Sequence, residues 1–246
     1  MKKRITRWHI ALLIVIVLVI AGLLLWRYLI PYAPEQNAET ALISGGGVTV
    51  EQNDNWISFE PSVILGAAVI FYPGALVKAE AYAPLGRSLA AAGHPFYIAK
   101  MPLNLAVTKA DAAAEIIRVH PKLNFVLGGH SLGGVMASRY AADHPDQVEG
   151  VFFLASYPDE QGSLKAATLS VLSVLGTEDQ VIDKDNYRKG RFLLPDNTLY
   201  YSVEGGNHAQ FGSYGPQKGD GKATISEAEQ QSRTVRVMLD WLGNLR

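Results

Sequence analysis

The sequence contains no cysteine among its 246 residues, which excludes disulfide bonds, thiolate metal ligands and a cysteine nucleophile. It also has little net charge, because 22 lysines and arginines against 23 aspartates and glutamates leave a formal value of -1. Basic residues cluster only at the extreme N-terminus, so we expect no nucleic-acid partner. Internal repeats and low-complexity tracts are missing too. With 48% hydrophobic residues, the chain can form one well-buried domain of ordinary size and an appendage.

The appendage is an N-terminal apolar stretch, which we predict to be a transmembrane signal anchor over residues 8–30. Basic residues at positions 2, 3, 4 and 7 form a tail, residues 1–7, that should stay in the cytoplasm. A helix over the anchor would be about 34 Å long, slightly more than a hydrocarbon core of about 30 Å. We therefore expect a single-pass protein of the cell membrane with an extracytoplasmic catalytic domain. The alternative is a cleavable signal peptide, which would give a secreted form.

Residues 31–47 are small and polar and predict a linker, so the main domain should cover residues 48–246. In that domain short β-rich runs alternate with helical patterns, and the middle runs are continuously apolar, as in parallel strands covered on both faces. This alternation predicts an α/β fold, namely a doubly wound, mostly parallel eight-stranded sheet with helices on both faces. The candidate strands are Val48–Glu51, Trp56–Phe59, Ala67–Tyr72, Phe96–Ala99, Leu123–Leu127, Val151–Ala155, Leu169–Leu175 and Leu199–Val203. The candidate helices are Ala79–Ala92, Thr108–His120, Leu132–Asp143 and a C-terminal helix with a capping box from Ser226 to Glu229.

One strand-to-helix junction carries a chemical pattern. The run Leu123–Leu127 is followed by Gly-Gly-His-Ser-Leu-Gly-Gly and then by a helical stretch, which is the pattern of a nucleophile elbow with Ser131 at its tip. The turn is so tight that side chains two residues before and after the serine would collide, so Gly129 and Gly133 remove them. By itself the pattern is short, and an incidental serine in a glycine-rich connection is the alternative.

A serine hydroxyl is a weak nucleophile and needs a base that a third group orients. Asp179 follows a predicted strand and is the candidate acid, with Glu178 and Asp183 left open as alternatives. His208 follows the next predicted strand and is the candidate base. Serine, acid and histidine then occur in the chain order that elbow-type hydrolases use.

An oxyanion formed by attack on a carbonyl needs preorganised N–H donors. The backbone N–H of Leu132, directly after the serine and at a helix N-terminus, is one candidate. The N–H of Ala75, in the Pro-Gly-Ala loop after an early strand, is the other. An ordinary Pro-Gly turn is the alternative for that loop.

The chain resembles the α/β-hydrolase superfamily over about Ala67 to Leu245, and within it the compact bacterial family 5 group that is similar to dienelactone hydrolases. That resemblance implies a triad of Ser131, Asp179 and His208. Dienelactone hydrolases proper use a cysteine nucleophile, which this chain lacks, so their specific activity is not implied. The motifs that carry the resemblance are Tyr72–Val77, Tyr82–Leu85, Met101–Ala106, the elbow, Gly205–Phe211, Tyr214–Gln217 and Gly219–Gly221.

The segment between Ser156 and Thr168 is about a dozen mostly polar residues, so we expect no large cap domain and an open site. Residues of the loop after the base should border the pocket, unless that loop only packs on the C-terminal helix. The pocket candidates are Gly74, His130, Gln210, Phe211 and Tyr214.

These patterns together predict a serine hydrolase that cleaves carboxylic esters (EC 3.1.1, carboxylesterase-like) through an acyl-enzyme, with a small acyl or ester compound as substrate. An acyltransferase or peptidase with the same triad is one alternative. A non-catalytic, membrane-tethered binding protein on the same fold is another. No metal and no organic cofactor is implied, and the oligomeric state stays open.

Overall fold

The computed structural model describes residues 7–245 of the chain, and of residues 7, 10, 11, 24–26 and 28 only the backbone. The chain divides into two units between Pro31 and Tyr32. The described part of the first unit is helix α1 (Arg7–Tyr28) and the residues that follow it. The predicted basic tail, residues 1–7, lies outside the described residues except for the backbone of Arg7.

The predicted membrane anchor is corrected by the structure. Among the helices that the structure describes, none combines the length and the apolar character needed to cross a membrane. A hydrocarbon core about 30 Å thick requires about 20 consecutive apolar residues. The predictions of a transmembrane segment over residues 8–30 and of a single-pass membrane location are therefore wrong.

The predicted linker, residues 31–47, is folded from Tyr32 onward. Tyr32 pairs with Val77 in a parallel β-bridge, and helix α2 (Gln36–Ala41) buries Ala38 completely. The small polar composition predicted an exposed connection, whereas small side chains also let a short helix pack closely against its neighbours. The second unit therefore begins at Tyr32 and not at the first strand.

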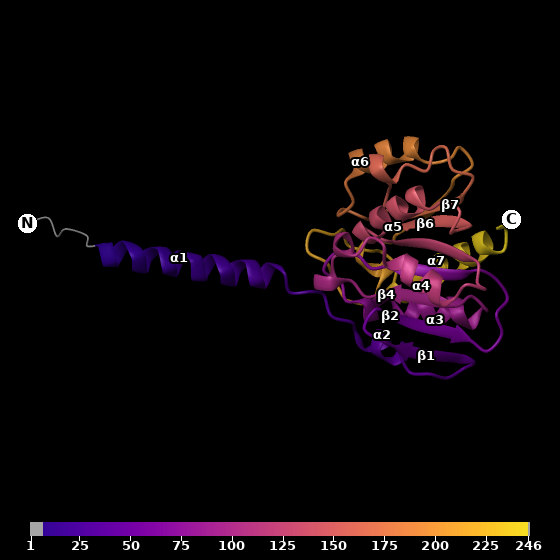
Figure 1. The fold of residues 1–246 in the computed structure, drawn as a ribbon, viewed down its shortest axis with the longest axis horizontal. Helices are drawn as coiled ribbons and strands as arrows, with labels where there is room; N and C mark the ends of the chain where they lie inside the picture. Colours follow the sequence, from indigo (N-terminus) through magenta and orange to yellow (C-terminus); the bar gives the residue numbers. More distant parts are fainter. Residues whose placement is uncertain (1–6, 246) are drawn as a thin grey trace, which may run out of the picture. The chain divides into compact units, whose positions relative to one another are not determined.

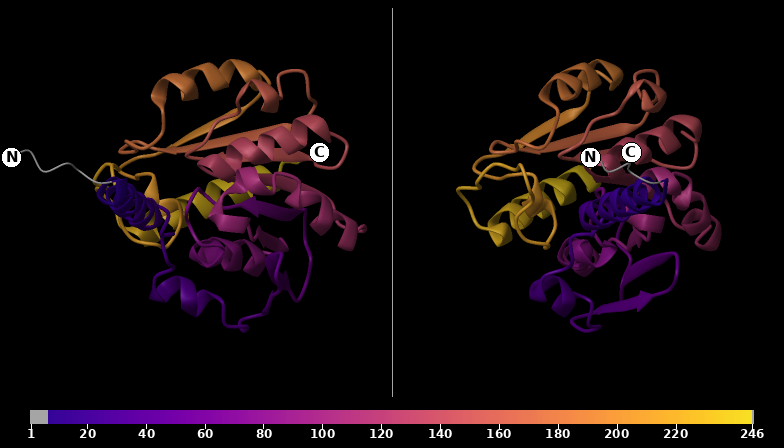
Figure 2. Two further views of the ribbon diagram at one scale, coloured as in Figure 1. Left: turned by 60° about the vertical axis from the view of Figure 1, so that its left-hand side comes forward. Right: turned by 90° about the vertical axis from the view of Figure 1, so that its left-hand side faces the viewer.

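All eight predicted strands are present and form one sheet in the described chain (Figure 1). The strand order is β1-β2-β4-β3-β5-β6-β7-β8, in which the β1–β2 and β2–β4 pairs are antiparallel and the other pairs parallel. Figure 2 shows the N-terminal strands in indigo at one edge and β7 and β8 in orange at the other. The predicted α/β, mostly parallel sheet is confirmed. The strands are β1 (Val48–Gln52), β2 (Trp56–Pro61), β3 (Ala68–Tyr72), β4 (Phe96–Ala99), β5 (Phe125–His130), β6 (Gly150–Leu154), β7 (Ser170–Gly176) and β8 (Leu199–Val203).

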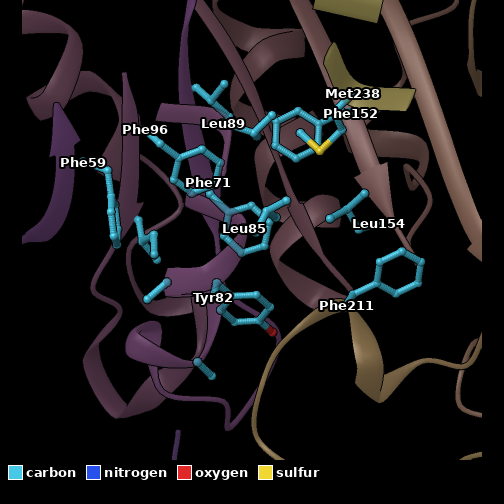
Figure 3. Packing of buried hydrophobic residues seen from close by; sticks show 14 of the residues in the cluster. Phe59, Phe71, Tyr82, Leu85, Leu89, Phe96, Phe152, Leu154, Phe211 and Met238 are labelled. Atoms are coloured by element: carbon cyan, nitrogen blue, oxygen red, sulfur yellow. The ribbon is translucent and has the colours of Figure 1, made fainter. Parts of the chain in front are cut away.

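Helices cover both faces of this sheet, which explains why β3, β5 and β6 are buried along their whole length. Alternate residues of β3 enter two separate hydrophobic clusters. One cluster packs against α3 and α7, and the other against α4 and α5. Figure 3 shows part of the first cluster, with the Tyr82 hydroxyl on the Phe211 side of its ring. The helices are α3 (Ala83–Ala91), α4 (Ala112–Val119), α5 (Leu132–Asp143), α6 (Lys184–Gly190) and α7 (Glu227–Leu242).

Helix boundaries follow local chemistry. Of the predicted capping box of α7, the N-cap bond is present, since the Ser226 hydroxyl accepts the Glu229 N–H at 3.2 Å, whereas the Glu229 carboxylate pairs with Arg233. The helix predicted from Ala79 begins as a 3₁₀ turn, Ala79–Tyr82, and becomes α-helical where a proline occupies the first turn of α3. Helix α6 was not predicted, because its short polar sequence has no apolar stripe.

Candidate active site

Ser131 lies in the turn between β5 and α5 with a left-handed backbone, φ 51° and ψ -126°. That conformation is costly for a residue with a side chain and persists where the surrounding packing fixes it. A Cβ at Gly129 would lie 2.4 Å from the carbonyl oxygen of Tyr72, and one at Gly133 would lie 2.1 Å from the same oxygen. Strand β3 thus passes so close to the turn that only glycine fits, and Ser131 is held half-buried at the tip.

His208 and Asp179 form a buried pair. They follow β8 and β7, which are parallel neighbours, so both loops leave the same end of the sheet. His208 Nδ1 lies 2.8 Å from Asp179 Oδ2, and each side chain is 1% exposed. The second oxygen, Oδ1, accepts the N–H groups of Val181 and Ile182, each at 2.9 Å. Since a carboxylate only accepts hydrogen bonds, Nδ1 carries the proton, and in the neutral ring Nε2 keeps a lone pair.

The two alternative acids, Glu178 and Asp183, have other hydrogen-bond partners. The Glu178 carboxylate accepts a hydrogen bond from the adjacent Thr177 hydroxyl at 3.4 Å. Asp183 caps α6, where one carboxylate oxygen accepts the N–H groups of Asp185 and Asn186 at 3.0 and 2.9 Å. Of the three acids, Asp179 is the one that the fold brings to His208.

A cavity of about 250 Å³ is lined by both Ser131 and His208. Within residues 7–245, the buried Nε2 atom of His208 has no hydrogen-bond partner. A buried acceptor without a hydrogen bond destabilises the folded protein, so a proton donor that binds to this nitrogen would relieve that cost. The described segment between β6 and β7 carries only the 3₁₀ turn Glu160–Gly162, and no large cap domain. The other lining residues are Leu132, Val135, Ala155, Ser156, Tyr157, Val181, Ile182 and Asp183.

The two predicted oxyanion donors are placed differently. Leu132 is the first residue of α5 and lines the cavity. Ala75 is half-buried and does not line the cavity. It lies in a turn that is closed by a hydrogen bond of 3.2 Å from the Val77 N–H to the Gly74 carbonyl.

The five predicted pocket residues also do not line this cavity. Phe211 and Tyr214 are buried in the core, 2% and 5% exposed. Gln210 borders a different hollow of about 520 Å³. Their loop packs on the C-terminal helix, since the Ser213 hydroxyl donates to Glu227 Oε1 at 2.5 Å. The loop therefore packs against the C-terminal helix and also borders the hollow that Gln210 lines.

His130 and Gly74, the remaining two candidates, meet through Tyr82. The Tyr82 oxygen lies 2.8 Å from His130 Nδ1 and accepts the Gly74 N–H at 3.1 Å. His130 Nε2 lies 3.1 Å from the backbone carbonyl of His208. Burial, and the nearby His208, lower the pKa of His130 well below its ordinary value. Burial likewise raises the pKa of Tyr82, so both side chains are neutral at physiological pH.

Sequence reasoning missed two residues that hold the His208 loop. Gln230 of α7 accepts the Asn207 N–H at 2.9 Å and donates to the Asn207 carbonyl at 2.8 Å. Asp220 accepts the Ala209 N–H at 2.8 Å. A signal for Gln230 exists in the sequence, because it is spaced by four from Thr234 and by eight from Met238 on the buried face of α7. A glutamine on the buried face of a helix is expected to have hydrogen-bond partners within the protein.

A third hollow, of about 730 Å³, lies over β1, β2 and β4 and is lined in part by Trp56, Glu60, Tyr97 and His120. The Tyr97 hydroxyl donates to Glu60 Oε1 at 2.6 Å, and the Tyr97 and His120 rings are 4.8 Å apart. For metal ions, the described part of the chain offers no cluster of three or more histidine, aspartate or glutamate side chains.

Three comparisons relate this chain to known proteins. A stretch of 57 residues, 23% of this chain, is 47% identical to a pimeloyl-[acyl-carrier protein] methyl ester esterase of Photorhabdus laumondii, and it spans only 20% of that protein. A structure described as a predicted CIB-like hydrolase from Thermoplasma acidophilum aligns with a TM-score of 0.60 at 18% identity, over 81% of this chain and 100% of that one. A putative lipase from Acinetobacter baumannii aligns with a TM-score of 0.60 at 13% identity, over 85% of this chain and 95% of that one.

The structural alignments, at such low identity, show a shared fold. Residues 68–232, more than half of the chain, match the sequence profile of the alpha/beta hydrolase family. That stretch runs from the first residue of β3 into α7, so it includes the Ser131 turn, the Asp179 and His208 loops and the parallel strands that hold them. The chain belongs to the alpha/beta hydrolase family.

Proposed function

We propose that this hydrolase cleaves carboxylic esters by an acyl-enzyme mechanism, with Ser131 as nucleophile, His208 as general base and Asp179 as the group that orients His208. The observation that carries the proposal is the buried Asp179–His208 hydrogen bond of 2.8 Å, which leaves the second ring nitrogen of His208, Nε2, without a partner in the described chain, in a residue that lines the same cavity as Ser131.

The chemistry follows from these positions. His208 Nε2 takes the Ser131 proton as the serine oxygen attacks the acyl carbon, and Asp179 stabilises the resulting imidazolium. The tetrahedral intermediate collapses, and the leaving alcohol receives the proton from Nε2. Water then attacks the acyl-enzyme with the same base, which releases the acid and restores the serine.

The oxyanion of each tetrahedral intermediate needs N–H donors. The Leu132 N–H is well suited, because Leu132 lines the cavity at the N-terminus of α5, where the helix dipole favours negative charge. We assign the second donor to the N–H of Ala75, which lies in the loop after β3. Since Ala75 does not line the cavity, this assignment requires the oxyanion to lie at the side of the cavity nearest that loop.

The substrate should be a small ester. A cavity of about 250 Å³ is lined largely by apolar side chains and has little room for a long acyl chain. The local similarity to methyl ester esterases points in the same direction, although it covers only a fifth of those proteins.

Labelling with a fluorophosphonate probe tests the nucleophile. Wild type should be labelled, Ser131→Ala should not, and Ser88→Ala, an exposed serine of α3, should behave as wild type. Folded wild type that takes no label would favour a binding protein on a hydrolase fold.

A series of p-nitrophenyl esters tests the substrate. We expect kcat/KM to fall by at least tenfold between acetate or butyrate and dodecanoate. Repeating the reaction with added alcohols or amines separates hydrolysis from acyl transfer, since a transferase would yield a new ester or amide in place of the free acid.

A further inference from the structure

We infer that Tyr82 and His130 are positioning residues, which join the Gly74 loop to the backbone of His208 and so fix the base relative to the nucleophile turn. This inference rests on the function proposed above, because it concerns how the proposed base is held. It adds two residues that act through other groups and do not touch the reacting atoms.

Tyr82 and His130 form a bridge of three hydrogen bonds that runs from the Gly74 N–H to the His208 carbonyl, and the atoms involved fix the direction of each bond. The His208 carbonyl can only accept, so His130 Nε2, 3.1 Å away, must carry a proton. In the neutral ring Nδ1 then accepts, and the Tyr82 hydroxyl donates to it at 2.8 Å. The same hydroxyl oxygen accepts the Gly74 N–H at 3.1 Å. Every polar atom of the bridge therefore has a partner, and only one tautomer of His130 satisfies them all.

The bridge is enclosed. Tyr82 is fully buried and His130 is 1% exposed. The His130 ring lies 4.4 Å from the His208 ring and 5.9 Å from the Phe211 ring, measured between centroids. A Cβ at Gly74 would lie 2.7 Å from His130 Nδ1, so the loop backbone approaches the imidazole as closely as packing allows. A side chain packed on all sides cannot shift without moving its neighbours.

His130 connects the proposed base to the nucleophile turn because of its place in the chain. It is the residue directly before Ser131, so it belongs to the rigid end of β5 that carries the nucleophile. Through Nε2 it holds the backbone of the proposed base, and through Tyr82 it holds Gly74, the neighbour of the proposed oxyanion donor Ala75. Asp179 fixes the ring of His208, whereas His130 fixes its main chain.

Tyr82→Phe breaks the bridge with the loss of one oxygen atom. Tyr97→Phe is the matched control, since Tyr97 is also fully buried and its hydroxyl also donates to a side chain, but at the hollow over β1, β2 and β4. We expect Tyr82→Phe to lower kcat for p-nitrophenyl acetate about 10- to 100-fold, with KM changed less than about threefold, because small displacements of reacting groups are costly. Tyr97→Phe should keep kcat within about twofold.

His130 provides the rescue test. The amide of His130→Gln can still donate to the His208 carbonyl, whereas His130→Phe fills the space with no donor. The glutamine variant should therefore retain about tenfold more kcat than the phenylalanine variant. Equal kcat values for these two variants, or for Tyr82→Phe and Tyr97→Phe, would overturn the positioning role.

A second readout does not depend on turnover. Nitrogen-15 NMR of wild type should show His130 as the neutral tautomer protonated at Nε2 between pH 5 and 8, and Tyr82→Phe should shift the His208 ring signals where Tyr97→Phe does not. Wild type that takes no fluorophosphonate label would overturn the proposed function and, with it, the catalytic part of this inference. Labelled wild type with His130 protonated at Nδ1 would overturn the bridge alone.

Discussion

Two of the three hollows described above contain similar side chains but connect them differently. In the hollow over β1, β2 and β4, the carboxylate of Glu60 is bonded to the Tyr97 hydroxyl, and the half-exposed His120 ring packs against the tyrosine. At the carboxyl ends of the parallel strands, the carboxylate of Asp179 is bonded to a buried imidazole. The first hollow is almost three times larger, about 730 against 250 Å³.

Volume by itself therefore does not select the site that we propose to be reactive. At that site His208 is bonded to Asp179 through Nδ1, its buried Nε2 has no hydrogen-bond partner in the described chain, and both His208 and Ser131 line the cavity. Such an arrangement needs an acceptor on one ring nitrogen and nothing on the other, inside a site that excludes water. Four experiments test this contrast, in order of decreasing effect.

Asp179→Asn should lower kcat about 1,000- to 10,000-fold, because an amide no longer enforces protonation of His208 at Nδ1. Glu178→Gln is the control, because the Glu178 carboxylate accepts the hydroxyl of the adjacent Thr177 and Glu178 does not line the cavity, so kcat should change less than about threefold. The measurement is steady-state hydrolysis of p-nitrophenyl acetate. A larger loss in Glu178→Gln than in Asp179→Asn would reverse the assignment of the acid.

Ala75→Pro removes one N–H from the loop after β3. Proline is favoured at the second position of such a turn, so the Gly74–Val77 turn should persist. If the Ala75 N–H donates to the oxyanion, kcat should fall about 100- to 1,000-fold, as for other oxyanion donors. Circular dichroism and the melting temperature check the fold. An unchanged kcat in folded protein would mean that the second donor lies elsewhere.

His130→Gln should flatten the pH dependence of stability. Burial lowers the pKa of His130 in the folded state, whereas an unfolded histidine titrates near 6.5. Below about pH 6.5 the unfolded chain therefore binds a proton that the folded chain does not. As a result, the free energy of unfolding decreases by up to about 1.4 kcal/mol for each unit by which the pH is lowered. Urea unfolding between pH 7 and 5 should show this extra slope in wild type and not in the variant. Parallel curves would contradict a buried, neutral His130.

Tyr97→Phe should have the smallest effect on catalysis. It removes the bond to Glu60 and should cost about 1 kcal/mol of unfolding free energy, with kcat within about twofold of wild type. Chemical denaturation and ester hydrolysis on the same preparation measure both values. A large loss of kcat would give the larger hollow a catalytic role and remove the contrast between the two regions.

Much of the site could be predicted because local rules fix it. Gly129 and Gly133 flank Ser131 at the spacing that a tight strand-to-helix turn requires, and Asp179 follows β7 as His208 follows β8. Parallel strands bring such loops to one end of the sheet whatever their separation along the chain. The pairing of Asp179 with His208 could therefore be expected before any distance was known.

The segments that are hardest to predict are those whose role depends on what packs against them. Phe211 and Tyr214 were expected at a pocket because they follow the base, but apolar rings in a loop are equally suited to the core, and both are buried. Residues 31–47 have a polar composition typical of a linker, yet α2 packs in the second unit. The apolar stretch over residues 8–30 predicted a membrane span that no described helix provides.

By itself, the sequence determined the strand and helix alternation, the elbow at Ser131 and the order of its partners, because these depend on residue spacing and backbone sterics. Only the tertiary structure decided which of three acids meets His208, and that His130, an incidental position in the motif, joins Tyr82 to the backbone of that base. The reason is physical: a hydrogen bond between residues 78 positions apart depends on the packing of β3, β5 and the loop after β8 together, and no local pattern encodes that packing.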